Sequence, residues 1–264
     1  MVADLHNDYL TDKNAAQLLK KYSHEDNYIV GAIFKGKRSF CQALEITRLF
    51  FKKRTSNLFL AYEDFSYSES FSMLEKLLDF SPVYVTLTWN GENALGGGAG
   101  TKTGLSSRGR DVIKLLNERG IALDLSHLGR RSFFEALDIA ENVVCSHVAF
   151  SSVRRHKRNL DDEQLKALYE RRAIVGLCLY SEFLTDKAVS SEADVIAHID
   201  HFADRFGVDT LAIGTDFYGC EDFPEGFGDY GFGLRLKKAL FAAGYDEIAA
   251  NKILYENALS LLYK

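Results

Sequence analysis

The chain has few of the residues that interrupt or cross-link a fold. Its 264 residues include two prolines, Pro82 and Pro224, one tryptophan and four cysteines. The cysteines lack the paired C-x-x-C spacing, so we expect reduced thiols in a cytosol and no cysteine ligand for a metal. No apolar run approaches the roughly 20 residues that span a bilayer. These absences argue against a disulfide framework, a zinc ribbon and an integral membrane protein.

Excess positive charge is also missing. The formal net charge is -5 and the pI is near 5.8, which argues against nucleic acid as the main partner. No basic and apolar leader precedes Val2–His6, which already reads as a strand, so we expect an unexported, cytoplasmic protein. A hydrophobic fraction of 47% and a mean hydropathy of -0.14 predict one soluble domain over residues 1–264. The sequence shows no internal repeats and does not determine the oligomeric state; a homodimer is compatible with it.

Eight apolar segments rich in Val, Ile, Leu, Phe and Tyr have the character of buried strands. They are Val2–His6, Tyr28–Phe34, Leu58–Glu63, Val83–Trp89, Ile121–Ser126, Val143–His147, Ala173–Tyr180 and Leu211–Phe217. Stretches with helical apolar spacing lie between them: Phe40–Phe51, Phe71–Leu78, Val112–Leu116, Phe133–Ile139, Leu165–Tyr169, Val195–Phe206 and Leu234–Leu240.

This alternation predicts an α/β protein with a single (β/α)8 TIM-type barrel and a C-terminal helix at about Asp246–Leu262. A doubly wound open sheet is the main rival architecture. It would gather its ligand-binding groups at one switch point, and not around a ring of strand ends.

Metal-binding side chains stand at or just past the ends of five of these strands. His6 and Asp8 follow the first, and strand alternation would place them on one face together with Asp4. His127 and His147 end the fifth and sixth strands. Because active sites of such barrels form at the C-terminal ends of the strands, we expect a catalytic metal centre there.

Two carboxylates complete this set. Glu63 ends the third strand and could bridge two ions; the alternative is a charge that favours the start of the next helix, and the nearby histidines favour the bridging role. Asp216 ends the eighth strand, where a proton-shuttling aspartate is expected, and its alternative role is to orient a ligand imidazole. Imidazole and carboxylate donors together suit zinc or a related divalent metal, and five candidate ligands exceed the needs of one tetrahedral ion.

Several segments resemble, in order, the landmarks of the membrane dipeptidase (renal dipeptidase) family of zinc peptidases, in the amidohydrolase superfamily. They are His6-Asn7-Asp8, Thr86-Leu87-Thr88-Trp89-Asn90, Asp124-Leu125-Ser126-His127, Ser146-His147, Arg158-Asn159-Leu160-Asp161-Asp162, His198-Ile199-Asp200-His201 and Gly214-Thr215-Asp216-Phe217. The resemblance covers essentially the whole chain.

The resemblance implies a site with two divalent ions, most simply Zn²⁺. His6 and Asp8 would bind one ion, His127 and His147 the other, and Glu63 would bridge them. A hydroxide between the ions would attack the peptide carbonyl, and Asp216 would handle the proton.

The resemblance also implies that Arg158 holds the free carboxylate of a dipeptide, as a guanidinium can with two parallel hydrogen bonds. The residues alone favour a solvated role, because Arg158 ends the basic run Arg154-Arg155-His156-Lys157-Arg158. Trp89 and Tyr180 could line the substrate pocket, or simply pack. We expect His198 and His201, in a helix outside the barrel, to be structural.

The chain also departs from the family pattern. Trp89 stands where relatives often have a histidine that steadies the substrate carbonyl, and Tyr218 replaces a second aspartate. The leading function is therefore a zinc dipeptidase for small dipeptides. The alternatives are an amidohydrolase for another small amide, lactam or lactone, and a catalytically silent metal-binding scaffold.

Overall fold

The computed structural model describes residues 1–263 and contains eight parallel strands whose order is that of a closed barrel, β1 to β8. The strands are β1 (Ala3–Asn7), β2 (Tyr28–Phe34), β3 (Leu58–Glu63), β4 (Tyr84–Thr86), β5 (Ala122–Asp124), β6 (Val143–Val148), β7 (Ile174–Cys178) and β8 (Leu211–Gly214). Helices alternate with them, so the predicted (β/α)8 fold is confirmed.

The helical elements are a 3-10 turn η1 (Asp8–Leu10), α1 (Ala15–Tyr22), α2 (Phe40–Lys53), α3 (Phe71–Leu78), α4 (Ser107–Glu118), α5 (Arg130–Leu137), α6 (Asp162–Glu170), α7 (Ser181–Leu184), α8 (Glu192–Phe206), α9 (Phe232–Ala242), α10 (Glu247–Asn251), a π-helical turn η2 (Lys252–Glu256) and α11 (Asn257–Leu262). The expected C-terminal helix is thus present as three consecutive helical segments. Among the described residues, none of these helices is both long and apolar enough to cross a membrane.

Polar side chains mark where several helices begin. Ser39 and Gln42 form a capping box at the start of α2, and Asp161 and Gln164 do the same for α6. Each pair satisfies two backbone N–H groups that the first helical turn leaves without partners. The long segments between strands therefore start their helices at defined residues.

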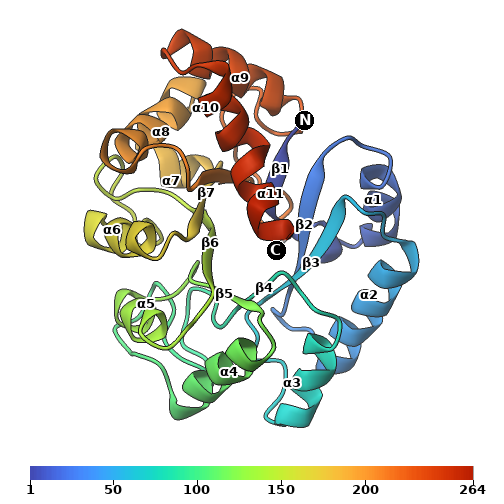
Figure 1. Ribbon diagram of the computed structural model, residues 1–264. Helices are drawn as coiled ribbons and strands as arrows, with labels where there is room; N and C mark the ends of the chain where they lie inside the picture. Colours follow the sequence, from blue (N-terminus) through green and yellow to red (C-terminus); the bar gives the residue numbers. More distant parts are fainter. Residues whose placement is uncertain (264) are drawn as a thin grey trace. The chain divides into compact units, whose positions relative to one another are not determined.

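The chain divides into two compact units, and the first comprises residues 1–7, 25–29 and the chain from Cys145 onward. Within it, β7 pairs with β8, and α11 lies beside β1 and β8 (Figure 1). Gly176 and Gly214 both face the carbonyl oxygen of Ser146, which lies 1.9 Å from where a Cβ atom would stand. Only glycine permits this approach of three strands next to His147.

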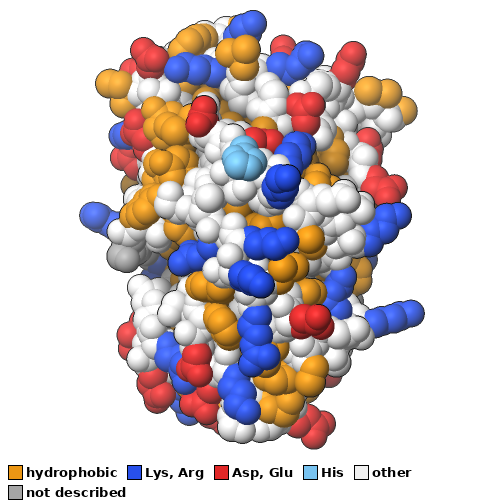
Figure 2. All heavy atoms as spheres, turned by 90° about the vertical axis from the view of Figure 1, so that its right-hand side faces the viewer, with side chains coloured by type: hydrophobic (Ala, Val, Ile, Leu, Met, Phe, Trp, Pro, Cys, Tyr) orange, Lys and Arg blue, Asp and Glu red, His pale blue; other side chains and the backbone are white. Residues whose placement is uncertain are grey.

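The second unit comprises residues 8–24 and 30–144. Within it, α1 packs against α2, and α2 packs against α3. Both α1 and α2 end in exposed lysine pairs, Lys20–Lys21 and Lys52–Lys53, which suit the negative end of the helix dipole. Figure 2 shows the face on which these helices lie, with Lys and Arg side chains gathered along its middle.

Four strands end earlier than the sequence predicted. β4, β5, β7 and β8 stop at Thr86, Asp124, Cys178 and Gly214, so the residues expected at the strand tips stand in the loops beyond them. Asp8 begins the turn η1 and does not continue β1, so strand alternation does not apply to it. Helix α1 matches no helical stretch expected from the sequence.

Candidate metal centre

Two candidate ligands, His6 and His147, and the candidate proton-transfer residue Asp216 lie in the first unit, at the ends of β1, β6 and β8. The rings of His6 and His147 are fully buried, with centroids 3.7 Å apart. Nε2 of His6 lies 3.9 Å from Oδ1 of Asp216. The donor atoms of His6 lie within 4.8 Å of those of each partner, close enough for His6 to share an ion with either.

The backbone holds Asp216 in an unusual conformation. Its φ of 62° lies in the left-handed region, which non-glycine residues rarely adopt. The N–H of Asp216 donates to the carbonyl of His6 at 3.0 Å, so the two candidate residues are tied through their main chains. His127 also has a positive φ, 66°. Strain of this kind persists where the surroundings over-determine it, and it concentrates at functional sites.

Arg158 lies in the loop after β6, as predicted, but it is buried and not solvated. Its side chain is 3% exposed, and one terminal nitrogen donates to the carbonyl of His147 at 3.3 Å. Its guanidinium also lies over the ring of Phe183. Within residues 1–263, its Nε has no hydrogen-bond partner and no carboxylate forms an ion pair with it. The neighbouring Arg154, in contrast, pairs with Asp186 at 2.8 Å.

Helix α8 fastens this loop through His198, which is structural as expected. Nδ1 of His198 accepts the N–H of Phe150 at 3.1 Å, and Nε2 lies 3.1 Å from the carbonyl of Leu184. Burial lowers the pKa of His198 to about 4. The ring therefore stays neutral near pH 7, as an acceptor at Nδ1 must be. His201 lies 2.7 Å from Asp162.

Other groups near Asp216 were not expected from the sequence. The thiol of Cys178, at the end of β7, lies 3.9 Å from Oδ2 of Asp216. Burial raises the pKa of Cys178 well above its usual range, and the charge of Asp216 adds to the shift. Within residues 1–263, none of the four cysteines forms a disulfide bond. Tyr180 follows β7 and packs against Phe183, and burial, with Glu182 beside it, raises its pKa to about 12.

In the second unit, Glu63 and His127 form a buried pair. Nε2 of His127 lies 2.7 Å from Oε1 of Glu63, and Nδ1 lies 3.0 Å from the side-chain oxygen of Asn90. A carbonyl-type partner at Nδ1 fixes the ring and leaves Nε2 as the atom for a ligand, the usual arrangement of a metal-binding histidine. Asn90 was not singled out from the sequence, although it directly follows Trp89.

Trp89 forms an exposed wall next to this pair. Its ring stacks on His127 with centroids 6.2 Å apart, contacts Phe34 at 5.4 Å, and remains 46% exposed. Asp8, the other candidate ligand of this unit, is buried in η1. Each unit therefore contains part of the predicted ligand set. The binding roles of these residues stay predictions.

Comparisons with known proteins agree with the fold and the chemistry. The model of the membrane dipeptidase family, peptidase family M19, matches residues 54–264. An uncharacterised Klebsiella pneumoniae protein encoded in the pqqA 5' region is 31% identical over 187 residues, covering 66% of this chain and 69% of its own length. Dipeptidase tcpJ of Claviceps purpurea is 30% identical over 162 residues, covering 60% of this chain and 38% of its own length.

Solved structures are similar over nearly the whole chain. Dipeptidase AC, a metallopeptidase of family M19, superposes with a TM-score of 0.81 at 23% identity, covering 99% of this chain and 97% of its own. A metallopeptidase from Rhodobacter sphaeroides, liganded with a phosphinate mimic of the dipeptide L-Ala-D-Ala, gives 0.82 at 22% identity, covering 99% and 98%. The match to the family model over most of the chain shows that it belongs to the membrane dipeptidase family, peptidase family M19, and is a metal-dependent hydrolase.

Proposed function

We propose that this protein is a binuclear zinc dipeptidase that cleaves small dipeptides with a free C-terminal carboxylate. The observation that carries the proposal is Arg158. Its guanidinium is 3% exposed and, within residues 1–263, pairs with no carboxylate. A buried charge without a counter-ion is costly, so its natural partner is a ligand carboxylate. Its bond to the carbonyl of His147 ties it to the end of the strand that supplies a candidate ligand.

The donor set fits divalent metal ions of the zinc type. We propose that His6 and Asp8 bind one ion, that His127 and His147 bind the other, and that Glu63 bridges them. Support comes from each unit separately. In the first, the buried rings of His6 and His147 lie with centroids 3.7 Å apart, and in the second, Nε2 of His127 lies 2.7 Å from Oε1 of Glu63. When bound, such ions lower the pKa of a coordinated water toward neutrality and polarise a carbonyl.

Arg158 would bind the substrate, and Asp216 would transfer the proton. Arg158 would hold the terminal carboxylate with two parallel hydrogen bonds, which orients the scissile bond. Asp216 would accept the proton released by the attacking water and then donate it to the departing amine, so the carboxylate is regenerated in each turnover. The left-handed backbone at Asp216 keeps that carboxylate at the end of β8, toward His6.

Trp89 and Tyr180 would form walls of the substrate pocket. Trp89 is half exposed on the face of His127, and Tyr180 packs against Phe183, the ring that lies under Arg158. The similar Rhodobacter protein holds a phosphinate mimic of L-Ala-D-Ala, which supports a ligand of dipeptide size. The second candidate is hydrolysis of another small amide, lactam or lactone, which Trp89 would permit because it replaces the histidine that relatives often have at this position.

The test compares substrates and two arginine variants. The purified protein should contain about two zinc ions per chain, since five candidate ligands exceed the needs of one tetrahedral ion. It should hydrolyse L-Ala-D-Ala and L-Ala-L-Ala faster than the corresponding dipeptide amides. Arg158→Gln should lower kcat/KM for the free acids by about ten- to a hundredfold, the effect of losing a charge-assisted hydrogen bond, and should leave amides nearly unchanged.

Arg154→Gln is the matched control, because Arg154 lies in the same loop and pairs with Asp186. This variant should keep the preference for free acids. If amides and free acids are cleaved equally by the wild type, the carboxylate role of Arg158 is wrong and the broader amidohydrolase function gains. A zinc-loaded protein inactive on every amide would support the scaffold alternative.

A single domain, a cytoplasmic location and a homodimer stay predictions.

A further inference from the structure

A fully buried carboxylate, Asp4, joins the ends of β1 and β8. Its Oδ1 accepts the N–H of Thr215 at 2.8 Å and the N–H of His6 at 3.2 Å. Its Oδ2 accepts the hydroxyl of Thr215 at 2.7 Å. The same hydroxyl lies 3.3 Å from the carbonyl of His6 and accepts the N–H of Phe217. Asp4 therefore contacts the backbone of a candidate ligand and the residue directly before Asp216.

Tyr230 adds a fourth donor to Asp4 from a distant loop. Its hydroxyl donates to Oδ2 of Asp4 at 2.6 Å and accepts from the side-chain amide of Asn7 at 2.9 Å. These two partners flank His6 in the sequence, so one phenol hydroxyl spans the tip of β1. The ring of Tyr230 packs against Phe217, which follows Asp216, with centroids 5.3 Å apart.

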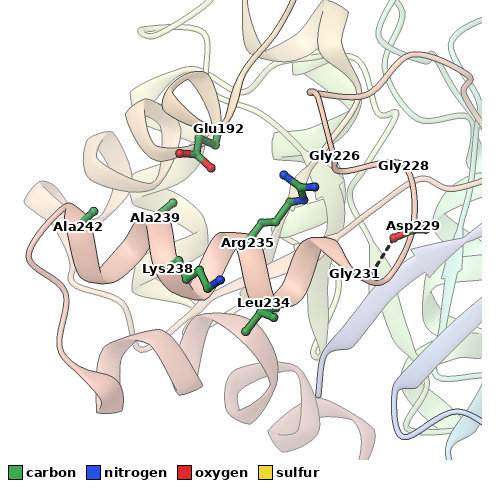
Figure 3. Close-up of a pocket in the computed structure, with 10 residues that line it drawn as sticks. All are labelled: Glu192, Gly226, Gly228, Asp229, Gly231, Leu234, Arg235, Lys238, Ala239 and Ala242. Carbon is green, nitrogen blue, oxygen red and sulfur yellow. Dashed lines mark hydrogen bonds between the residues drawn. The ribbon is translucent and has the colours of Figure 1, made fainter.

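The loop that presents Tyr230 has a constrained shape. It leads into α9 and walls a groove of about 1000 Å³, where Figure 3 shows Arg235 extending from α9 toward Gly226. Gly226 has a φ of +79°, and an added Cβ would lie 2.6 Å from Arg235. Asp229 accepts the N–H of Gly231 at 2.8 Å. The close contact at Gly226 and the hydrogen bond between Asp229 and Gly231 therefore limit the conformation of the loop around Tyr230.

We propose that Tyr230 is a positioning residue that, through Asp4, fixes His6 for metal binding and Asp216 for proton transfer. The role of Asp216 in proton transfer rests on the proposed function, whereas the metal-binding part does not require peptide hydrolysis. Without the hydroxyl, Asp4 loses one of its donors and the side-chain amide of Asn7 loses one hydrogen bond, so the tip of β1 is less constrained. Partners of ligand residues commonly change metal affinity or activity by about ten- to a hundredfold when removed.

The decisive variant is Tyr230→Phe, which removes one oxygen and keeps the ring. Zinc affinity is measured without substrate, by competition with a chromophoric chelator, and kinetics are then measured at saturating zinc. We expect zinc affinity to fall about tenfold, kcat to fall about tenfold and KM to change less than about twofold. Tyr245→Phe is the matched control, because its hydroxyl also donates to a carboxylate, Oδ1 of Asp200, at 2.7 Å. It should leave zinc affinity and kcat within about twofold of the wild type.

A second pair of variants tests the same junction if Tyr230→Phe folds poorly. Thr215→Val removes the hydroxyl that bonds Asp4 and should lower zinc affinity and kcat, while Thr215→Ser keeps the hydroxyl and should restore both. Wild-type zinc affinity and kcat in Tyr230→Phe, or equal losses in Thr215→Val and Thr215→Ser, would overturn the proposal. If the wild type cleaves no dipeptide, the proposed function fails, and the substrate-free zinc affinities still decide the role of Tyr230.

Discussion

The residues around His6 and those around His127 are held in different ways. His6 and Asp216 are joined main chain to main chain, and the buried Asp4 bonds the backbone of His6 and of Thr215. The main chain of His127 also has a bond, because its carbonyl accepts the N–H of Ala99 at 2.8 Å, but its ring is held by side chains: Glu63, Asn90 and the stacked ring of Trp89. Buried polar bonds occur in both groups, whereas the group around His127 also includes an exposed ring, Trp89, that can be exchanged.

We expect this difference to matter for substrate selection at Trp89. Asp216, the proposed proton-transfer residue, is positioned together with His6 by buried hydrogen bonds. Loss of these bonds would leave buried polar atoms without partners, which lowers the stability of the fold. The departure from the family pattern, Trp89, lies in the other group, and its indole is 46% exposed. An exposed ring can be replaced at small cost in stability, so this is where preference for a substrate can change.

The largest effect should come from breaking the chemistry in the first group. Asp216→Asn removes the proposed general acid and base while keeping the shape of the side chain. Turnover should fall by about two to four powers of ten, the usual scale for such a group. Zinc content and circular dichroism should remain near wild type. The measurement is kcat for L-Ala-D-Ala at saturating zinc.

Asp222→Asn serves as the control, because Asp222 is an exposed residue six positions further along the same loop. It should change kcat by less than about threefold, as expected for an exposed position. Near-normal turnover of zinc-loaded Asp216→Asn would contradict the proton-transfer role and leave Asp216 as a partner that only orients His6.

The sequence predicted the strands well, because buried parallel strands are nearly continuous apolar runs. Their ends could not be predicted from apolarity. β8 stops at Gly214 because the next two N–H groups donate to Asp4 and to His6. β5 stops at Asp124, whose own side chain accepts the N–H of Ser126. Local bonds from side chain to backbone compete with strand pairing, and composition does not report them.

Candidate ligands could be proposed from the sequence where the ligand type and the strand end coincide, as for His6, His127 and His147, and their roles stay predictions. It was not predictable where distant segments meet. Tyr230 reaches Asp4 across 226 positions of sequence, and no local pattern links the two. Arg158 illustrates the opposite error, because a run of five basic residues predicts a solvated surface. In the structure Arg158 is buried, with its guanidinium over the ring of Phe183, whereas Arg154 pairs with Asp186.

A smaller effect is expected on the free energy of unfolding, which should depend on pH through His198 in the unit that contains His6. Burial lowers the pKa of His198 from 6.5 to about 4, so between these values the unfolded chain binds a proton that the native chain does not. The free energy of unfolding should therefore fall as pH falls from about 6.5 to about 4, by about 3 kcal/mol for this group. The loop that carries Arg158 depends on the same ring, through Phe150.

Urea unfolding of the metal-free protein at pH 7 and at pH 4 measures this contribution. His198→Asn cannot take up that proton, so its stability deficit relative to the wild type should shrink by about 3 kcal/mol at the lower pH. His24→Asn, at an exposed position, should show a difference from wild type that stays within about 0.5 kcal/mol. An unchanged deficit of His198→Asn at the two pH values would mean that His198 is not buried as a neutral ring.

The smallest effect on turnover should come from the second group, at Trp89. An indole donates one hydrogen bond and offers a large apolar face, but it cannot become a cation near neutral pH as an imidazole can. Trp89→Ala should therefore change kcat for L-Ala-D-Ala by less than about fivefold, because the residue moves no proton. It should raise kcat/KM for dipeptides with a bulky first residue by about tenfold, because the wall that Trp89 forms with Phe34 is removed.

Trp89→Phe, which keeps a smaller ring on His127, should give an intermediate preference. If Trp89→Ala instead loses activity on every dipeptide by the same large factor while its zinc is retained, the indole contacts the reacting carbonyl, and the two groups would share the chemistry.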